Sequence, residues 1–468
     1  MGSNKLPPGP PGLPILGNLF DIPPVEPWHV FYKWARQYGV NSGEVVYLQV
    51  LGRPVVLLNS VQACNDLFEG RHAIYSDRPH FPLMDLMGSG WDIPMMTYGQ
   101  KWRTLRRIFS TKYSVASSLV SFYDEHRRSS VVFLQHVLNS PNEWANHIRL
   151  RQGQTIMGAT YGIPIESRQD PLIRTADEYM GAVSLALSPA MWLVNPLWMT
   201  IPGVRQWRRS AEELRTKPFM MAKEAFNKGL GRPSYVTSFL QEGHVDEQAI
   251  CDTAAVAYGA GYETSVISAD VFFLAMVLYP DVRNRAQEEL DRVVGNDRLP
   301  DFTDRDRLPY ISAIMKEVLR WHPPAPTGVP HLLQEDDVYN GFYLPKGTVV
   351  MGNVWGLLHD PEMYPEPERF MPERFIRDGA FDCSANDPSR FTFGFGRRVC
   401  PGRVFSEDSI WLLAARFLSV FDISPADPKA LPEVSFTGGA APRVKPFECI
   451  IRPRSTAAAE LVEVSARA

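Results

Sequence analysis

The chain has 468 residues, of which 45% are hydrophobic and 21% are charged, and its formal net charge is −4. This length and apolar content suffice for a large core, no linker, charge block or repeat divides the sequence, and the charge gives no reason to expect nucleic acid as a partner. The five cysteines are scattered without a CxxC pair or zinc spacing, which argues against a disulfide scaffold and indicates a reduced, cytosol-facing protein.

The N-terminal region is rich in proline, with Leu6-Pro7-Pro8-Gly9-Pro10-Pro11-Gly12-Leu13-Pro14. Such a run predicts a stiff polyproline spacer without internal hydrogen bonds. Taken alone, it is equally compatible with a disordered tail or a ligand of an SH3-type domain. The first five residues are too polar for a signal peptide, and no apolar run approaches the ~18–20 residues of a transmembrane helix.

A β-hairpin is expected next, because residues 45–48 and 54–58 are apolar strands that flank Gly52-Arg53. Helical patterns then dominate from residue 60 to residue 325. Trp102 and Arg106 lie one helical turn apart in this region, although an ordinary basic amphipathic helix would explain them too. Farther on, a helix is predicted from Asp304 to Trp321, followed by a hairpin around Asn340-Gly341.

The longest helical pattern runs from Glu247 to about Tyr279 and contains Ala260-Gly261-Tyr262-Glu263-Thr264. Glycine weakens a helix interior, and a threonine hydroxyl can bond to a carbonyl one turn earlier. Together they could open a groove for a diatomic ligand and water, where the Thr264 hydroxyl and the Glu263 carboxylate relay protons. A helix kink required only by packing is the competing interpretation.

The most informative stretch is Phe393-Gly394-Phe395-Gly396-Arg397-Arg398-Val399-Cys400-Pro401-Gly402. A thiolate ligand needs positive charge and backbone N–H groups nearby, and the two glycines would let the backbone fold tightly under the sulfur, where a Cβ would clash. The helix expected from about Arg403 to Arg416 would direct its positive end toward the sulfur. Arg398 could meet an anionic group of the same cofactor, so these parts suit a haem with one axial thiolate and two propionates. A buried structural cysteine in a glycine-rich turn is the alternative.

The pattern Phe-x-x-Gly-x-Arg-x-Cys-x-Gly at Cys400 resembles the haem-binding loop of the cytochrome P450 superfamily. Glu317 and Arg320, with Arg374 in Pro372-Glu373-Arg374-Phe375, resemble the buried charge network of that superfamily. The resemblance covers residues ~6 to ~455. It implies a mainly α fold with small β-sheets (α+β), in which one domain has a large helical lobe and a small β lobe. The expected boundaries are 1–17 for a proline-rich hinge after a missing membrane anchor, 18–455 for the haem-thiolate monooxygenase domain and 456–468 for a dispensable tail.

The resemblance also implies a set of site residues around heme b (iron protoporphyrin IX). Cys400 would be the axial ligand of the iron, and Glu263 and Thr264 would deliver protons. The other expected cofactor-binding residues are Trp102, Arg106, His331, Arg398, Phe393, Gly394 and Ala260. His331 stands where the family often has a cation for a propionate. Three segments are expected to line the substrate side, namely 81–96, 327–329 and 436–439.

The implied activity inserts one oxygen atom from O2 into a hydrophobic small molecule. Electrons would come from NADPH through a separate cytochrome reductase, because the chain lacks a nucleotide-binding glycine-rich loop of its own. The reductase would dock on a basic patch whose members are Lys101, Arg103, Arg107, Arg397 and Arg403. Scattered surface charge is an equally good interpretation of these five residues.

The residues in several motifs resemble those of basidiomycete fungal members of the family. This resemblance implies a microsomal enzyme of secondary or xenobiotic metabolism. Such an enzyme would be a monomer on the cytosolic face of the endoplasmic reticulum membrane. The apolar segment 191–199 could dip into the membrane surface, or it could be a buried connection. Two other functions stay open. One is a haem-thiolate isomerase, dehydratase or peroxygenase that needs no reductase, and the other is a non-catalytic haem-binding sensor.

Overall fold

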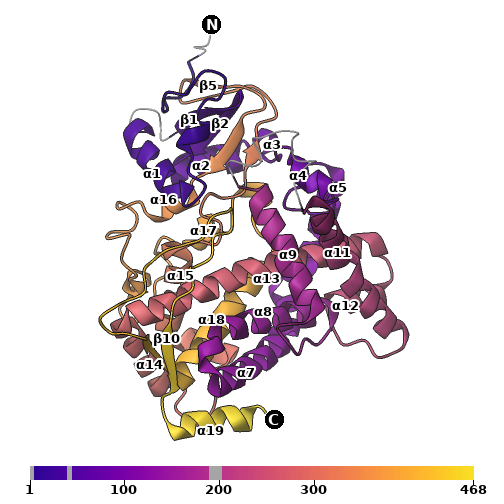
Figure 1. Ribbon diagram of the computed structural model, residues 1–468, viewed down its shortest axis with the longest axis vertical. Helices are drawn as coiled ribbons and strands as arrows, with labels where there is room; N and C mark the ends of the chain where they lie inside the picture. The colour runs from indigo at the N-terminus through magenta and orange to yellow at the C-terminus, as the bar shows by residue number, and fades with distance from the viewer. Residues whose placement is uncertain (1–4, 40–44, 189–202, 468) are drawn as a thin grey trace.

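The structure of the protein is a computed structural model that describes residues 5–39, 45–188 and 203–467. A large helical part carries a small β part at one end, and the two termini lie at opposite ends of the long axis (Figure 1). This arrangement confirms the expected mainly α fold with small β-sheets. The segment 191–199, for which membrane contact was predicted, lies outside the described residues.

The helices of the described residues are, in chain order, α1 (Pro27–Tyr38), α2 (Val61–Cys64), α3 (His72–Tyr75), α4 (Pro82–Leu86), α5 (Gln100–Tyr113), α6 (Ala116–Leu119), α7 (Tyr123–Asn139), α8 (Trp144–Tyr161), α9 (Pro171–Ala186), α11 (Val204–Asn227), α12 (Tyr235–Glu242), α13 (Glu247–Leu278), α14 (Pro280–Val293), α15 (Pro309–Trp321), α16 (Val354–Leu358), α17 (Ser389–Thr392), α18 (Arg403–Val420) and α19 (Thr456–Ser465). The strands are β1 (Val45–Val50), β2 (Arg53–Leu58), β3 (His331–Leu332), β4 (Asp337–Tyr339), β5 (Phe342–Leu344), β6 (Val349–Gly352), β7 (Ile376–Arg377), β8 (Ala380–Phe381), β9 (Phe421–Pro425) and β10 (Cys449–Pro453).

Helix α13 crosses the middle of the molecule and is packed by other helices, among them α8 and α18 (Figure 1). The Asp246 carboxylate caps its first turn by accepting a hydrogen bond from the Ala249 N–H, at 3.0 Å. The helix is long and apolar enough to cross a membrane, but 83% of its most apolar stretch is buried inside the protein. A helix that is apolar on nearly all sides is stable in the centre of a large core.

The small β part is a four-stranded sheet with the order β1-β2-β6-β3. Strands β1 and β2 form the predicted hairpin, and Leu51 and Gly52 in its turn both have positive φ, as a tight two-residue hairpin turn requires. Strand β6 pairs in parallel with β2 although almost 300 residues separate them along the chain. The second predicted hairpin, β4–β5, is present with Asn340 and Gly341 at its turn.

The proline-rich segment lies along the edge of this sheet. The Pro8 carbonyl accepts a hydrogen bond from the Tyr47 N–H at 2.9 Å, and Gly17 bridges to Val50. These contacts overturn the alternative of a disordered tail for residues 5–17. The extended backbone of a proline-rich chain keeps its carbonyls free to accept from a neighbouring strand.

Two helices at the C-terminal side of the chain differ from expectation. The helix predicted from Asp304 to Trp321 is two helices, a 3₁₀ helix at Phe302–Arg307 and α15, which begins at Pro309. The break falls at Leu308 because a residue before proline is disfavoured in the α conformation. The tail after Ser455 forms α19, whose Val462 side chain is fully buried. That this tail is dispensable stays a prediction.

Candidate active site

An internal cavity of about 320 Å³ lies between α13, α5, α9 and the loop before α18. Most of its wall is apolar. Cys400 lines the cavity and has exposed surface. The wall also carries the cations Arg78, Arg106 and Arg398 and one carboxyl side chain, Asp92. The cavity therefore combines a large apolar volume with a thiol and a cationic edge.

The loop before Cys400 is a tight turn that the two glycines make possible. Gly394 and Gly396 have φ values of 81° and 53°, in the left-handed region that favours glycine. A Cβ at Gly396 would overlap the Phe68 carbonyl, so this position also needs the missing side chain. At Gly394 a Cβ would meet nothing closer than 3.9 Å, so the expected clash is wrong there and the left-handed backbone is the reason for glycine. The Cys400 N–H then closes the turn onto the Phe393 carbonyl at 2.8 Å.

The surroundings of the Cys400 sulfur have opposing effects on the pKa of its thiol. Burial raises the pKa of the thiol, while the Gly402 N–H and the guanidinium groups of Arg106 and Arg403 lower it. Burial is the largest of these effects, and the N–H group and cations that the sequence led us to expect near the sulfur oppose it. A cysteine in such a place becomes a thiolate when a metal ion replaces its proton. Helix α18 begins at Arg403, as predicted, directly after the loop.

Arg398 and Arg106 stand at one edge of the cavity with Trp102. The Arg398 guanidinium lies 4.8 Å from the centre of the Trp102 ring, and that of Arg106 lies 6.0 Å from it. Arg106 donates to the Val399 carbonyl and Arg398 to the Met96 carbonyl. Nε and Nη1 of Arg398 are buried and have no hydrogen-bond acceptor among the described residues. Unpaired guanidinium N–H groups beside a cavity are typical of an anion site.

Arg78 is a third cation at this edge, and the sequence analysis did not identify it. Its side chain is buried and donates to the carbonyls of Pro94, Val329 and Pro330. Burial and the nearby Arg398 hold the pKa of Arg78 well below its usual value, and burial lowers the pKa of Arg398 to about 10. A bound anion would raise the pKa values of both arginines again, because it would stabilise their charged forms. The two propionates of a haem supply such anions, so the residues present fit this cofactor.

His331 also lines the cavity, but it differs from the cation that was expected. Burial and the Arg78 guanidinium hold the pKa of His331 well below its usual value, so the ring is neutral near pH 7. Its Nδ1 lies 2.7 Å from the Tyr75 carbonyl, which places the proton on Nδ1 and leaves Nε2 as an acceptor. A role at a propionate would require the ring to gain a proton, and the assignment of His331 stays a prediction.

The middle of α13 presents hydroxyl groups to the cavity. Thr264 Oγ1 donates to the Ala260 carbonyl at 2.8 Å, which is the bond predicted from the sequence. The Gly261 carbonyl accepts a hydrogen bond from Nε2 of Gln152 on α8 at 2.9 Å. A side chain outside α13 therefore bonds to the helix backbone at this glycine. A Cβ at Gly261 would also approach Ile156 Cδ1 to 2.9 Å. The glycine therefore permits close packing against α8, and the groove expected at this point stays a prediction.

Glu263 is separated from this groove. Its side chain does not line the cavity. The Glu263 carboxylate forms a salt bridge with Arg443, which lies in the segment before β10. The exposed fraction of the side chain is 4% for Glu263 and 30% for Arg443. The structure thus places Thr264 at the cavity but holds its acidic neighbour on another side of α13. The role of Glu263 in proton delivery stays a prediction.

The charge network around Glu317 is present as expected. Arg320 donates to both carboxylate oxygens of Glu317, at 2.7 and 2.8 Å, and Arg374 Nε donates at 3.2 Å. Glu317 and Arg320 are fully buried. Arg320 also donates to the carbonyls of Leu358 and Arg369, which ties α15 to the segment that leads to the cysteine loop. The network is structural, because none of its three side chains lines the cavity.

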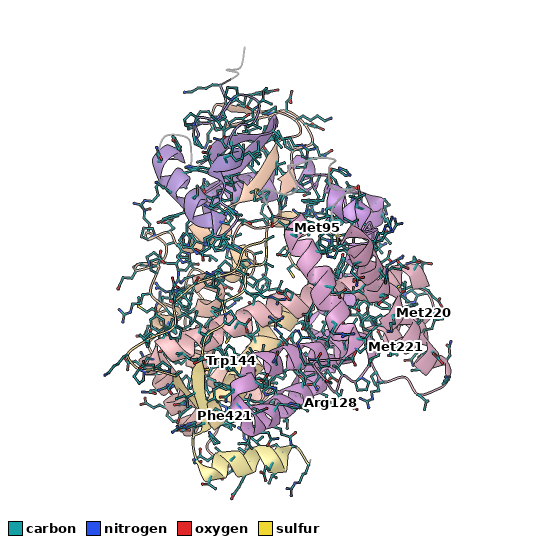
Figure 2. The ribbon with its side chains drawn as sticks, in the orientation of Figure 1. Met95, Arg128, Trp144, Met220, Met221 and Phe421 are labelled. Carbon is teal, nitrogen blue, oxygen red and sulfur yellow. The ribbon has the colours of Figure 1, made fainter. Side chains whose placement is uncertain are left out.

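Two of the three expected substrate-side segments line the cavity. Residues 91–95 and Gly328-Val329 are in its wall, and Figure 2 labels Met95, close to α9. The segment 436–439 is not in the wall, which instead includes Ala440 and Ala441, just beyond it. Outside the cavity, the five basic residues expected to receive a reductase are all exposed, on α5, in the cysteine loop and at the start of α18.

Comparison with known proteins shows what this chain resembles. A family model described as cytochrome P450 matches residues 7–448. A cytochrome P450 monooxygenase of Armillaria gallica is 39% identical, over 98% of this chain and 94% of its own length. The monooxygenase claR of Ampulloclitocybe clavipes and eriA of Hericium erinaceus are each 37% identical over 98% of this chain, and the matches cover 89% and 90% of their own lengths.

Proposed function

This chain belongs to the cytochrome P450 family and is a haem-thiolate monooxygenase. On that premise we propose which class of molecule it oxidises and how it receives electrons. Its substrate is a hydrophobic small molecule of fungal secondary or xenobiotic metabolism. Its electrons come from NADPH through a separate cytochrome reductase. The observation that carries this proposal is the position of Cys400 in the wall of a largely apolar cavity that Arg398 also lines, with two buried guanidinium nitrogens that have no acceptor among the described residues.

The residues around the cavity divide the work of holding the cofactor. Cys400 would hold the iron through its sulfur, and Arg78, Arg106 and Arg398 would hold the propionates. Heme b supplies the reduction of dioxygen and the transfer of one oxygen atom when it is bound. The apolar wall excludes bulk water and orients the substrate. Because all these residues come from one chain, a monomer would contain a complete site.

Thr264 would hold a proton at Oγ1 in the wall of the cavity, where dioxygen would be reduced. In the structure this proton is donated to the Ala260 carbonyl, and a small rotation of the hydroxyl would turn it toward the cavity. The Ser265 and Ser268 hydroxyls line the same wall and would keep water near it. Glu263 would resupply protons only after loosening from Arg443, since their ion pair now occupies its carboxylate.

The proposed location is the cytosolic face of the endoplasmic reticulum membrane. Leu13, Ile15 and Phe20 near the N-terminal end are exposed large apolar side chains, which supports contact of this end with a membrane surface. The exposed basic residues Arg103, Arg107 and Arg397 support docking of an acidic reductase on the side of the cysteine loop.

The proposal is tested by supplying oxygen of known origin. The purified protein, loaded with haem, is incubated with NADPH, a fungal cytochrome P450 reductase and a panel of terpene and aromatic compounds under ¹⁸O2. Products that carry one ¹⁸O atom and require both NADPH and reductase would support the proposal. Products that form without reductase, with oxygen from added peroxide or with no added oxygen, would favour the peroxygenase or isomerase alternatives.

A further inference from the structure

The wall of the cavity contains one carboxyl side chain among the described residues, that of Asp92. It belongs to the segment between α4 and α5, whose Pro94 and Met96 carbonyls accept hydrogen bonds from Arg78 and Arg398. Its side chain is 8% exposed, and no cation pairs with it within the described ranges. A carboxylate buried in an apolar wall without a cation is costly unless something binds it.

The hydrogen bonds of Asp92 are incomplete. Oδ2 accepts from the hydroxyl of Tyr179, on α9, at 2.8 Å. Oδ1 accepts no hydrogen bond from any described residue, although an ionised carboxylate has room for about four. Burial raises the pKa of Asp92 to about 6, against the opposing effect of the Tyr179 hydroxyl, so most of the side chain is ionised near pH 7. The free oxygen is thus an acceptor with no donor.

The surroundings make this end of the cavity a defined binding position. The Trp91 ring stacks on the Tyr179 ring, with centres 5.5 Å apart, and this contact holds in place the tyrosine that donates to Asp92. Met180, Val183 and Leu187 continue the wall along α9 and its end with apolar surface. A ligand that fills this end therefore meets one acceptor in an otherwise apolar environment.

We propose that Asp92 selects substrates that carry a hydrogen-bond donor, a hydroxyl or a protonated amine, on an otherwise apolar skeleton. The donor binds Oδ1 of Asp92, and the skeleton extends along α9 and α13 toward Cys400. Asp92 is thus a specificity-determining residue that fixes which end of the substrate faces the haem. This inference rests on the proposed function, because it assumes that the cavity receives the substrate.

The test compares three ligands that share one ten-carbon skeleton. Geraniol has a hydroxyl donor, geranyl methyl ether keeps the oxygen but has no donor, and N,N-dimethylgeranylamine is a protonated amine at pH 7.5. Dissociation constants are measured by calorimetry on the haem-loaded protein, and the haem absorbance shows whether the amine binds the iron instead. We expect geraniol to bind about tenfold more tightly than the ether, the effect of one hydrogen bond to a charged group.

Variants of Asp92 separate the two donor chemistries. Asp92→Leu should abolish the preference for geraniol over the ether. Asp92→Asn should weaken the amine more than the alcohol, because the amide keeps an acceptor oxygen but loses the negative charge that pairs with the cation. Asp85→Asn is the matched control, since this exposed acid of the neighbouring helix α4 pairs with His80, does not line the cavity and should leave all three constants unchanged.

Two outcomes would overturn the proposal. The first is equal binding of geraniol and its ether by the unaltered protein, a comparison that depends on no variant. The second is that Asp92→Leu and Tyr179→Phe weaken all three ligands by the same factor, which would make the Asp92–Tyr179 bond a structural tie only. The carbon monoxide spectrum of each variant is recorded in parallel. A normal thiolate spectrum with no donor preference would refute the role of Asp92 and leave the proposed monooxygenase function intact.

Discussion

The Arg398 guanidinium lies 4.8 Å from the centre of the Trp102 ring, and two of its buried nitrogen atoms have no acceptor within the part of the chain that the structure describes. These residues are almost 300 positions apart in the sequence, yet together they form one end of the cationic edge of the cavity. The ring supports the guanidinium from one side and directs its free N–H groups toward an anion. This relationship is the strongest structural argument that the cavity holds a carboxylate-bearing cofactor.

Replacing Arg398 with leucine should weaken haem retention by about tenfold, because one charge-assisted hydrogen bond to a propionate is lost. The measurement is the rate of haem transfer from the purified protein to excess apomyoglobin. Arg397→Leu is the control, because Arg397 is exposed and does not line the cavity. Equal rates for the two variants would show that Arg398 does not hold the cofactor.

Replacing Thr264 with valine should leave NADPH consumption largely intact but lower product formed per NADPH by about tenfold or more. The variant keeps the shape of the side chain and removes the proton that Oγ1 carries. Thr264→Ser should restore much of the yield, because serine keeps the hydroxyl group. The ratio of product to NADPH is measured for each variant with one substrate. A full yield from the valine variant would refute proton delivery by Thr264.

The pair Glu263 and Arg443 should behave as one unit in unfolding. Arg443→Met leaves the Glu263 carboxylate buried without a partner, so it should cost about 2 kcal/mol or more of the free energy of unfolding. Adding Glu263→Gln to that variant should recover part of the loss, since the uncompensated charge is then gone. Urea unfolding followed by circular dichroism gives the four values of this double-mutant cycle. Strictly additive effects would mean that the ion pair contributes no coupling.

The burial of Asp270 should make the free energy of unfolding depend on pH. Burial raises the pKa of its carboxyl to about 7 in the folded protein, against a usual value of 3.8. The folded state therefore binds a proton that the unfolded state has already released, and stability falls as pH rises from about 4 to 7. Asp270→Asn removes this penalty, so its stabilising effect should be about 2 kcal/mol larger at pH 8 than at pH 5.5. Urea midpoints at the two pH values measure the difference, and an effect independent of pH would contradict it.

Local patterns predicted those parts of the site that depend on neighbours along the chain. The turn at Gly394 and Gly396, the start of α18 and the Thr264–Ala260 bond each involve residues within a few positions of one another. Their geometry follows from backbone preferences and short hydrogen bonds, which a sequence pattern encodes directly. The long core helix α13 was likewise predictable, because its apolar composition leaves it no place but a core.

Contacts between distant segments could not be predicted in the same way. Arg78 is an isolated arginine in the sequence, and only the fold brings it to the carbonyls of Val329 and Pro330. Glu263 meets Arg443 across 180 positions, so no local pattern reveals that its carboxylate is already paired. The neutral state of His331 depends on burial and on Arg78, neither of which its own neighbours reveal.

The central claim is that Cys400 holds the iron of a haem in this cavity, and the carbon monoxide difference spectrum tests it most directly. The haem-loaded protein is reduced with dithionite, exposed to carbon monoxide and compared with Cys400→Ala. We expect a strongly red-shifted Soret band in the unaltered protein and its loss in the variant. A band typical of histidine ligation, or the same red-shifted band in Cys400→Ala, would contradict it.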